Sequence, residues 1–147
     1  METLLWVEGK IDPKIYKESV RSFSPINTRT NVNIVWIKSF EEFKGWIERN
    51  GLPDGLTVNY NLGDTTYISP KFWAAHLNRN VSAHIFEALT GYDCIIWLVK
   101  YCIEEGKLQM PRWNIHTYNT KAKEAMKLLL VSYEKYNKNN KVKYQER

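Results

Sequence analysis

Short apolar runs and amphipathic segments alternate along this chain, and this alternation limits its possible folds more than any other feature. Four apolar, β-prone runs predict strands at Thr3 to Val7, Val32 to Ile37, Leu56 to Tyr60 and Trp113 to His116. Four further segments predict helices, from Asp12 to about Val20, Ser39 to Asn50, Ala88 to Glu105 and Thr120 to about Tyr136. This order favours a parallel sheet with helices on both faces. We therefore expect a three-layer α/β domain with a small, mostly parallel sheet of about four strands.

End signals in the sequence support two of these helices. Ser39 and Glu42 have the spacing of a capping box, and Asn50-Gly51 is a typical helix stop. The segment from Ala88 to Glu105, which Gly106 should end, has the strongest helical pattern. Its residues expected to face the core are Ile95, Ile96, Leu98, Val99, Cys102 and Ile103.

The length and charge of the chain suggest one domain followed by a basic end. The 147 residues, 44% of them hydrophobic, are enough for one sizeable core. We predict a single domain over residues 1–136, with an insertion at about 65–85, and a tail over residues 137–147. From Glu134 onward five Lys and Arg residues outnumber two Asp and Glu residues, a net of +3 (5 − 2). This segment predicts a solvated, flexible tail; the alternative is a basic arm that contacts phosphates.

The cysteines and the apolar pattern suggest a soluble protein of the cytoplasm. Cys94 and Cys102 lie eight residues apart in a predicted helix, about 12 Å along its axis, which is too far for a disulfide. The first residues have no basic start, and no apolar run approaches the roughly 18 residues of a membrane span. The high content of Lys, Asn and Tyr suits an AT-rich genome, as in some phages, and the location would then be the host cytoplasm.

Polar residues follow three of the four predicted strands. Glu8 follows the first strand, Asn59 to Asn61 end the third, and His116-Thr117 end the fourth. In parallel α/β sheets, ligands bind at the carboxyl ends of the strands. The sequence therefore predicts a site where these side chains meet at one edge of the sheet.

The same positions carry a resemblance to a known family. The stretch GLPDGLTVNYNLGD resembles a Gly-x-Pro-Asp, strand, Asp-His-Asp-Leu-Gly-Asp pattern, and TGYDCIIWLVKYCIEEG resembles the helix that follows it. WNIHTYNTKAKEAMKLLL resembles a His-Ser-x-Asn-Pro turn between strand and helix. Together they resemble the cyclic-phosphate processing receiver domains, over about residues 3 to 132. The resemblance implies a receiver-like, flavodoxin-like fold and an activity on cyclic or other phosphates, often linked to RNA repair.

The chain departs from the family at its acidic pocket. Where the family has Asp-Asp after the first strand, this chain has Glu8-Gly9, and the family's Asp-His-Asp corresponds to Asn59-Tyr60-Asn61. Of four expected acids only Glu8 remains, so we expect no metal and no other cofactor. An amide also cannot act as a general base. The chain is therefore expected to be a binding protein more readily than an enzyme.

The remaining polar residues suit binding. Asn59, Asn61, Thr117 and Asn119 offer donors and acceptors for a nucleotide or phosphate, and Glu8 with His116 would be the acid–base pair if the chain is an enzyme. Simpler roles stay open: Asn59 and Asn61 would satisfy backbone groups at a turn, and His116 would be a hydrogen-bonded core histidine. In the same way, Thr90 and Asp93 would cap a helix. In a separate alternative, the Tyr60 ring plugs the pocket and no ligand enters.

Three functions remain open from the sequence. The first is a non-catalytic binding protein that modulates a protein partner, with Phe72 and Trp73 of the insertion as its partner surface. The second is a divergent enzyme acting on phosphate esters or cyclic phosphates of nucleotides or RNA. The third is an RNA-binding module that uses the basic tail and aromatic residues. His76 and His84 lack the neighbours that a zinc site requires, so no metal site is expected there.

Overall fold

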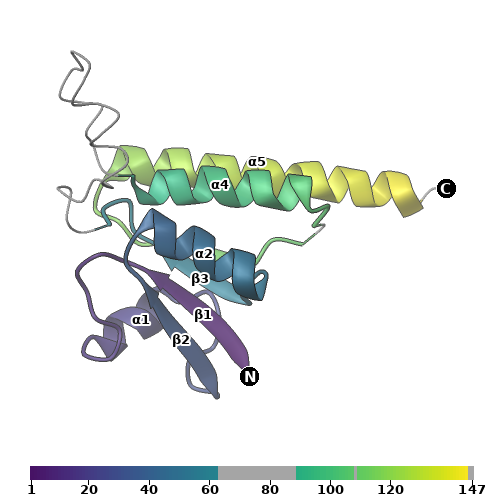
Figure 1. Cartoon of the computed structure of the whole chain (residues 1–147). Helices are drawn as coiled ribbons and strands as arrows, with labels where there is room; N and C mark the ends of the chain where they lie inside the picture. The colour runs from purple at the N-terminus through teal and green to yellow at the C-terminus, as the bar shows by residue number, and fades with distance from the viewer. Residues whose placement is uncertain (63–88, 108, 146–147) are drawn as a thin grey trace, which may run out of the picture.

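Four short strands form an all-parallel sheet in the order β2-β1-β3-β4. Figure 1 shows β1, β2 and β3 of this sheet. The computed structural model describes residues 1–62, 89–107 and 109–145. The strands are β1 (Glu2–Val7), β2 (Val32–Ile37), β3 (Gly55–Val58) and β4 (Arg112–Ile115). The predicted α/β class with a four-stranded parallel sheet is thereby confirmed. Since β2 and β4 lie at the edges, β1 and β3 form the centre.

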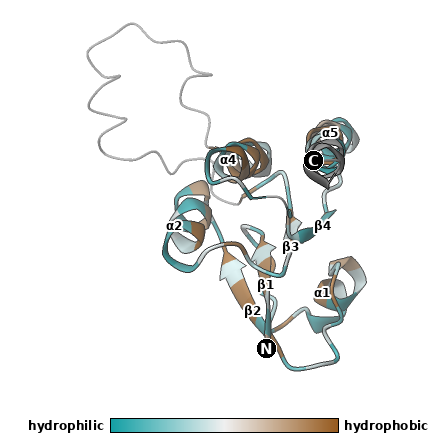
Figure 2. Ribbon diagram, turned by 90° about the vertical axis from the view of Figure 1, so that its right-hand side faces the viewer, coloured by the Kyte–Doolittle hydropathy of each residue, from teal (hydrophilic) through white to brown (hydrophobic). Residues whose placement is uncertain are grey.

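Helices cover both faces of this sheet (Figure 2). The helices are α1 (Lys17–Phe23), α2 (Phe40–Asn50), α4 (Gly91–Glu104) and α5 (Thr120–Gln145). Of the described helices, α1 is the one on the first face, and α2, α4 and α5 lie on the other. Among the helices of the described residues, none is long and apolar enough to cross a membrane.

Each face of the sheet has its own buried cluster, because successive strand residues point to opposite faces. Leu4 and Trp6 of β1 pack with Val20 of α1 and with Ile26. Leu5 and Val7 belong to the larger cluster under α2, α4 and α5. Buried apolar side chains on both faces are typical of a central parallel strand. This explains why β1 is apolar at four consecutive positions.

The first helix differs from its prediction. Residues after Asp12 form a separate turn, in which the Asp12 carbonyl accepts hydrogen bonds from the N–H groups of Ile15 and Tyr16. Tyr16 then has φ −103° and ψ 56°, outside the helical region, and α1 starts only at Lys17. The helix predicted from Asp12 to about Val20 is therefore wrong at both ends.

α4 begins at Gly91, later than the predicted start at Ala88, because Thr90 is extended and caps the helix. Its end at Gly106 is confirmed, and Gly106 has φ +65°, which favours glycine. Cys94 and Cys102 are both buried and free, as predicted. Ile103, predicted to face the core, is 54% exposed, so this assignment is wrong.

α5 continues to Gln145, beyond the predicted end near Tyr136. No Gly or Pro follows Thr120, so nothing in the sequence stops the helix. Tyr133 lies in the core, and its hydroxyl donates to the Lys107 carbonyl at 2.8 Å. The division into a domain and a flexible tail after residue 136 stays a prediction, and the insertion predicted at about 65–85 lies outside the described residues.

Candidate functional site at the strand ends

Glu8, Asn59 and His116 emerge side by side from three neighbouring strands. Val7, Val58 and Ile115 are paired in register across β1, β3 and β4. Each of the three site residues directly follows the last residue of its strand. The backbone pairing continues through them: Asn59 N–H donates to Val7 O at 2.9 Å, and His116 N–H donates to Val58 O at 3.0 Å. The order of connections reverses between β1 and β3, which is where ligands bind in folds of this type.

The Glu8 carboxylate is buried, 2% exposed, and both of its oxygens accept hydrogen bonds. Asn59 Nδ2 donates to Oε1 at 2.7 Å, and Lys10 N–H donates to Oε2 at 2.9 Å. Burial raises the pKa of Glu8, but contact with His116 and the hydrogen bonds from Lys10 and Asn59 outweigh it, so the pKa lies below its ordinary value of 4.5. The carboxylate is thus held in its charged form by its neighbours.

The His116 ring is fixed on both sides. Its Nδ1 lies 2.7 Å from Thr57 Oγ1, and its Nε2 lies 3.4 Å from Glu8 Oε1, longer than an ordinary hydrogen bond. Trp6 stacks on it with ring centres 4.2 Å apart and planes 7° apart, and the Phe23 ring lies 5.5 Å away. His116 is 6% exposed, and its Nε2 is the one buried side-chain polar atom without a hydrogen-bond partner in the described part of the chain.

Thr57, His116 and Glu8 form a hydroxyl, imidazole and carboxylate chain, the set of groups used by nucleophilic enzymes. Here, however, Thr57 is 0% exposed, and its hydroxyl lies in the sheet beneath the imidazole. An acid–base group must come within about 3 Å of the proton that it transfers. With all three groups buried, the chain of contacts can tie β1, β3 and β4 together, but no substrate reaches it in this conformation.

The other three residues predicted to bind a ligand follow the strand ends and form local turns. Asn61 is exposed, and its N–H donates to Asn59 Oδ1 at 3.2 Å. Thr117 Oγ1 accepts from the Asn119 N–H at 3.3 Å. Asn119 Oδ1 accepts from the Ala122 N–H at 3.0 Å, so its side chain caps α5. A role for these residues in ligand binding stays a prediction.

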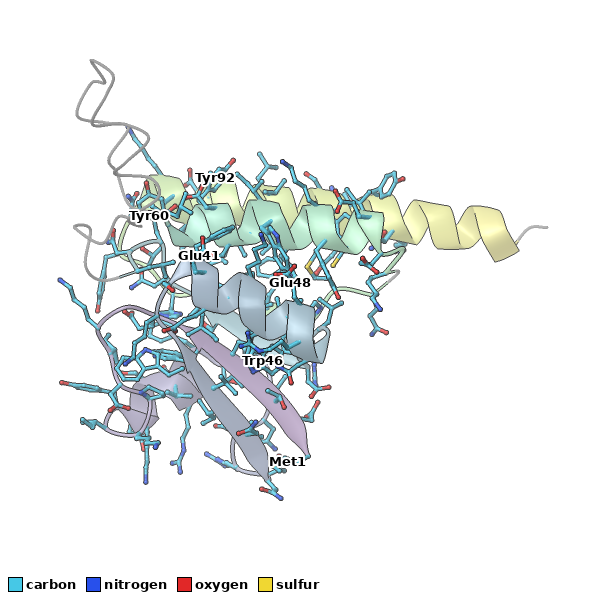
Figure 3. The ribbon with its side chains drawn as sticks, in the orientation of Figure 1. Met1, Glu41, Trp46, Glu48, Tyr60 and Tyr92 are labelled. Carbon is cyan, nitrogen blue, oxygen red and sulfur yellow. The ribbon has the colours of Figure 1, made fainter. Side chains whose placement is uncertain are left out.

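Tyr60 lies on the other side of the sheet from His116. Its ring packs against the cluster under α2 and α4, and its carbonyl accepts from the Gly91 N–H at 2.9 Å. Figure 3 shows Tyr60 at the end of α4 where Tyr92 also lies. The rings that cover His116 come instead from Trp6 and Phe23.

Comparison with protein families identifies the chain. The family model of the cyclic-phosphate processing receiver domain matches residues 14–132, which is most of the chain. This chain belongs to the cyclic-phosphate processing receiver-domain family. No curated protein and no solved structure matches it. The family match begins after Glu8-Gly9, so the correspondence of these two residues to the first acids of the cyclic-phosphate processing receiver domains stays an expectation.

A receiver-like acidic pocket implies Mg²⁺, and the residues at these strand ends do not fit that ion. Mg²⁺ takes hard oxygen donors, usually with one or two carboxylates. Glu8 is the one carboxylate in the cluster, and hydrogen bonds engage both of its oxygens. Within residues 1–62, 89–107 and 109–145, no group of three His, Cys, Asp or Glu side chains could hold a metal ion.

Another acid of the family pattern has a structural role here. Asp93 Oδ2 accepts from the Thr90 N–H at 2.7 Å and from the Thr90 hydroxyl at 3.1 Å. The interpretation of Asp93 and Thr90 as a helix cap is therefore confirmed. Asp64, Phe72, Trp73, His76 and His84 lie outside the described residues.

Sequence reasoning missed the residues that hold the cluster in place. Trp6 and Thr57 lie two positions before Glu8 and Asn59, so the strand period places them on the same face. Trp36 Nε1 donates to the Glu8 carbonyl at 2.6 Å, which fixes the chain just after β1. The two-residue period of a strand could have identified Trp6 and Thr57 from the sequence. The hydrogen bond from Trp36 to the Glu8 carbonyl could not be predicted in this way, because it depends on the pairing of β1 with β2.

The Glu8→Gln variant is expected to be less stable than the wild type by about 1–2 kcal/mol at neutral pH, because an amide has one acceptor oxygen where the carboxylate has two. Since the folded pKa of Glu8 is lowered, its contribution is complete above pH 4.5 and is lost as the pH falls through the folded pKa. The difference between the two proteins, measured by urea unfolding across pH, should therefore shrink in acid. Glu18→Gln, at an exposed ion pair with Arg21, is the control and should change stability little. A constant difference down to acid pH would contradict the assignment.

Proposed function

We propose that this chain is a non-catalytic member of its family, a receiver-like protein that acts by binding a protein partner. One observation carries the proposal: Asn59 donates to Glu8 across the β1–β3 junction, where receiver-like folds bind their ligands. An amide on one side and an engaged carboxylate on the other supply neither a metal site nor a free base. Without catalytic groups, the domain would act by binding a partner through its surface.

The enzyme alternative would need Glu8 and His116 to face an open pocket. The two side chains do come together, with Oε1 and Nε2 at 3.4 Å, but both are buried. A nucleotide or phosphate at the strand ends would have to displace the Trp6 and Phe23 rings or break the bond between Asn59 and Glu8. The RNA-binding alternative depends on the basic C-terminal residues, whose side chains beyond residue 138 lie outside the described part of the chain.

Two measurements on the full chain test this proposal together. The tagged protein is purified from its native cell, and the proteins that come with it are identified by mass spectrometry; we expect one partner at a fixed ratio. Purified protein is incubated with 2′,3′-cyclic nucleotides and with phosphate monoesters; we expect product to form no faster than in buffer. Turnover that the Glu8→Gln or His116→Ala variant abolishes would overturn the proposal and establish the enzyme.

A further inference from the structure

A pocket of about 650 Å³ lies between α1 and β2, away from the strand-end cluster. Its floor includes Ile34, Val35 and Trp36 of β2. Ile34 and Trp36 pair with Leu4 and Trp6 of β1, so they point to the face that α1 covers, and Val35 points to the opposite face. Val35 lies between the other two residues in the strand, so the pocket follows β2 over all three.

Among the described residues, the outer edge of β2 has no neighbouring strand, because β2 is the first strand in the order β2-β1-β3-β4 (Figure 1). An edge strand presents backbone N–H and C=O groups that can pair with another chain. Ile34 is 38% exposed although it is a large apolar residue in a strand. The edge therefore offers both backbone pairing and apolar contact to an incoming strand.

The wall opposite β2 is basic. Lys14, Lys17 and Arg21 line the pocket and are spaced three and four residues apart, so they follow one side of α1 and of the turn before it. In the described part of the chain, Lys14 and Lys17 form no ion pair, and Arg21 contacts only the exposed Glu18. The one acid in the lining is Asp12, so the ionised side chains there sum to +2 (3 − 1).

The positive charge of the pocket determines which kind of strand can bind there. Lysines beside an edge strand protect it against pairing with copies of the same protein, and the net charge of +5 repels a second copy. The same lysines attract an acidic strand. A hollow beside α2 and α4 has the opposite charge, since Glu48, Glu104 and Glu105 line it with Lys100; Figure 3 shows Glu48 on α2.

We propose that the groove between α1 and β2 binds an extended, acidic peptide segment of the protein partner, which adds as a strand to the outer edge of β2. Its carboxylates would contact Lys14, Lys17 and Arg21, and its apolar side chains would pack on Ile34 and Trp36. Two contacts fix the orientation of the Trp36 ring: its Nε1 donates to the Glu8 carbonyl, and Lys38 Nζ lies 4.0 Å from its ring centre. The inference rests on the proposed function and names the surface that performs it.

A direct test uses the full chain and a fluorescent peptide as long as β2 in which glutamate and valine alternate. A second peptide has proline in place of each valine, so it keeps the charge and loses the ability to pair as a strand. We expect the first peptide to bind, by fluorescence anisotropy in low salt, at least about tenfold more tightly than the second. Equal binding of the two peptides, or no binding of either, would overturn the inference.

Charge reversal identifies the surface. The Lys14→Glu/Lys17→Glu variant should bind the glutamate–valine peptide about tenfold more weakly, because two contacts become repulsive. The Lys100→Glu/Lys121→Glu variant makes the same change in net charge at exposed positions on α4 and α5 and should bind like the wild type. Equal weakening in both variants would show that only net charge matters and would overturn the inference.

Amide hydrogen exchange tests whether the peptide pairs with β2, which non-specific electrostatic attraction would not show. With the peptide bound, amides of Val32–Ile37 should exchange more slowly, whereas amides at the strand ends around Asn59 should not change. Protection at the strand ends without protection of β2 would overturn the inference. If the Lys14→Glu/Lys17→Glu variant still brings down the native partner, the groove fails as the docking surface while the proposed function stands.

Discussion

The Gly91→Ala variant is expected to lose about 3 kcal/mol or more of its free energy of unfolding. A Cβ at residue 91 would lie 2.1 Å from the carbonyl oxygen of Asn59 and 2.8 Å from its carbonyl carbon. These two nearest atoms belong to the backbone just after β3, and they cannot turn aside as a side chain can. The Gly91 N–H also donates to the Tyr60 carbonyl, so moving α4 away would break that bond. Urea unfolding followed by circular dichroism measures the loss.

Gly45→Ala is the matched control, since it adds the same methyl group at a glycine in α2. Its Cβ would lie 3.0 Å from Arg49 Nη1, the end of a flexible and exposed side chain. Because alanine favours a helix more than glycine does, this variant should be more stable by about 0.5–1 kcal/mol. A Gly91→Ala variant as stable as the wild type would mean that α4 does not lie this close to the end of β3.

The Asn59→Asp variant should lose about 2–4 kcal/mol of stability at neutral pH. It removes the amide that donates to Glu8 Oε1 at 2.7 Å and puts a second carboxylate in its place. Two carboxylates this close cannot both stay ionised without strong repulsion, so one of them should bind a proton. The loss should therefore decrease as the pH is lowered, because protonation of one carboxylate relieves the repulsion. The Glu8→Gln difference should also shrink in acid, but there because wild-type Glu8 loses its charge.

Magnesium extends this experiment to the chemistry of the family. Two carboxylates across the β1–β3 junction would restore donors that Mg²⁺ prefers, so millimolar Mg²⁺ should raise the melting temperature of Asn59→Asp. The same Mg²⁺ should leave the wild type unchanged, because Glu8 is already engaged. Asn31→Asp adds the same charge at an exposed residue before β2, away from the strand ends, and serves as the control. Stabilisation of the wild type by Mg²⁺ would refute our account of the strand ends.

The sequence allowed prediction of the sheet and of the meeting of Glu8, Asn59 and His116. Strand ends converge in any parallel sheet, so this followed from the alternation of strands and helices. Whether the meeting point is open could not be predicted, because burial of His116 depends on where Trp6 and Phe23 lie in three dimensions. The first helix was misplaced because Asp12-Pro13 begins a turn as readily as it begins a helix.

The order of the strands also has a consequence for how the chain folds. β1 pairs with β2 and with β3, so the first 58 residues contain three of the four strands of the sheet, together with α1 and α2. These contacts can form while the rest of the chain is still being synthesised. β4 then adds beside β3, on the side away from β1. A longer connection between β3 and β4 adds little to the free-energy cost of folding, because loop-closure entropy grows only slowly with length. An additional segment between β3 and α4 therefore leaves the nascent three-stranded unit complete.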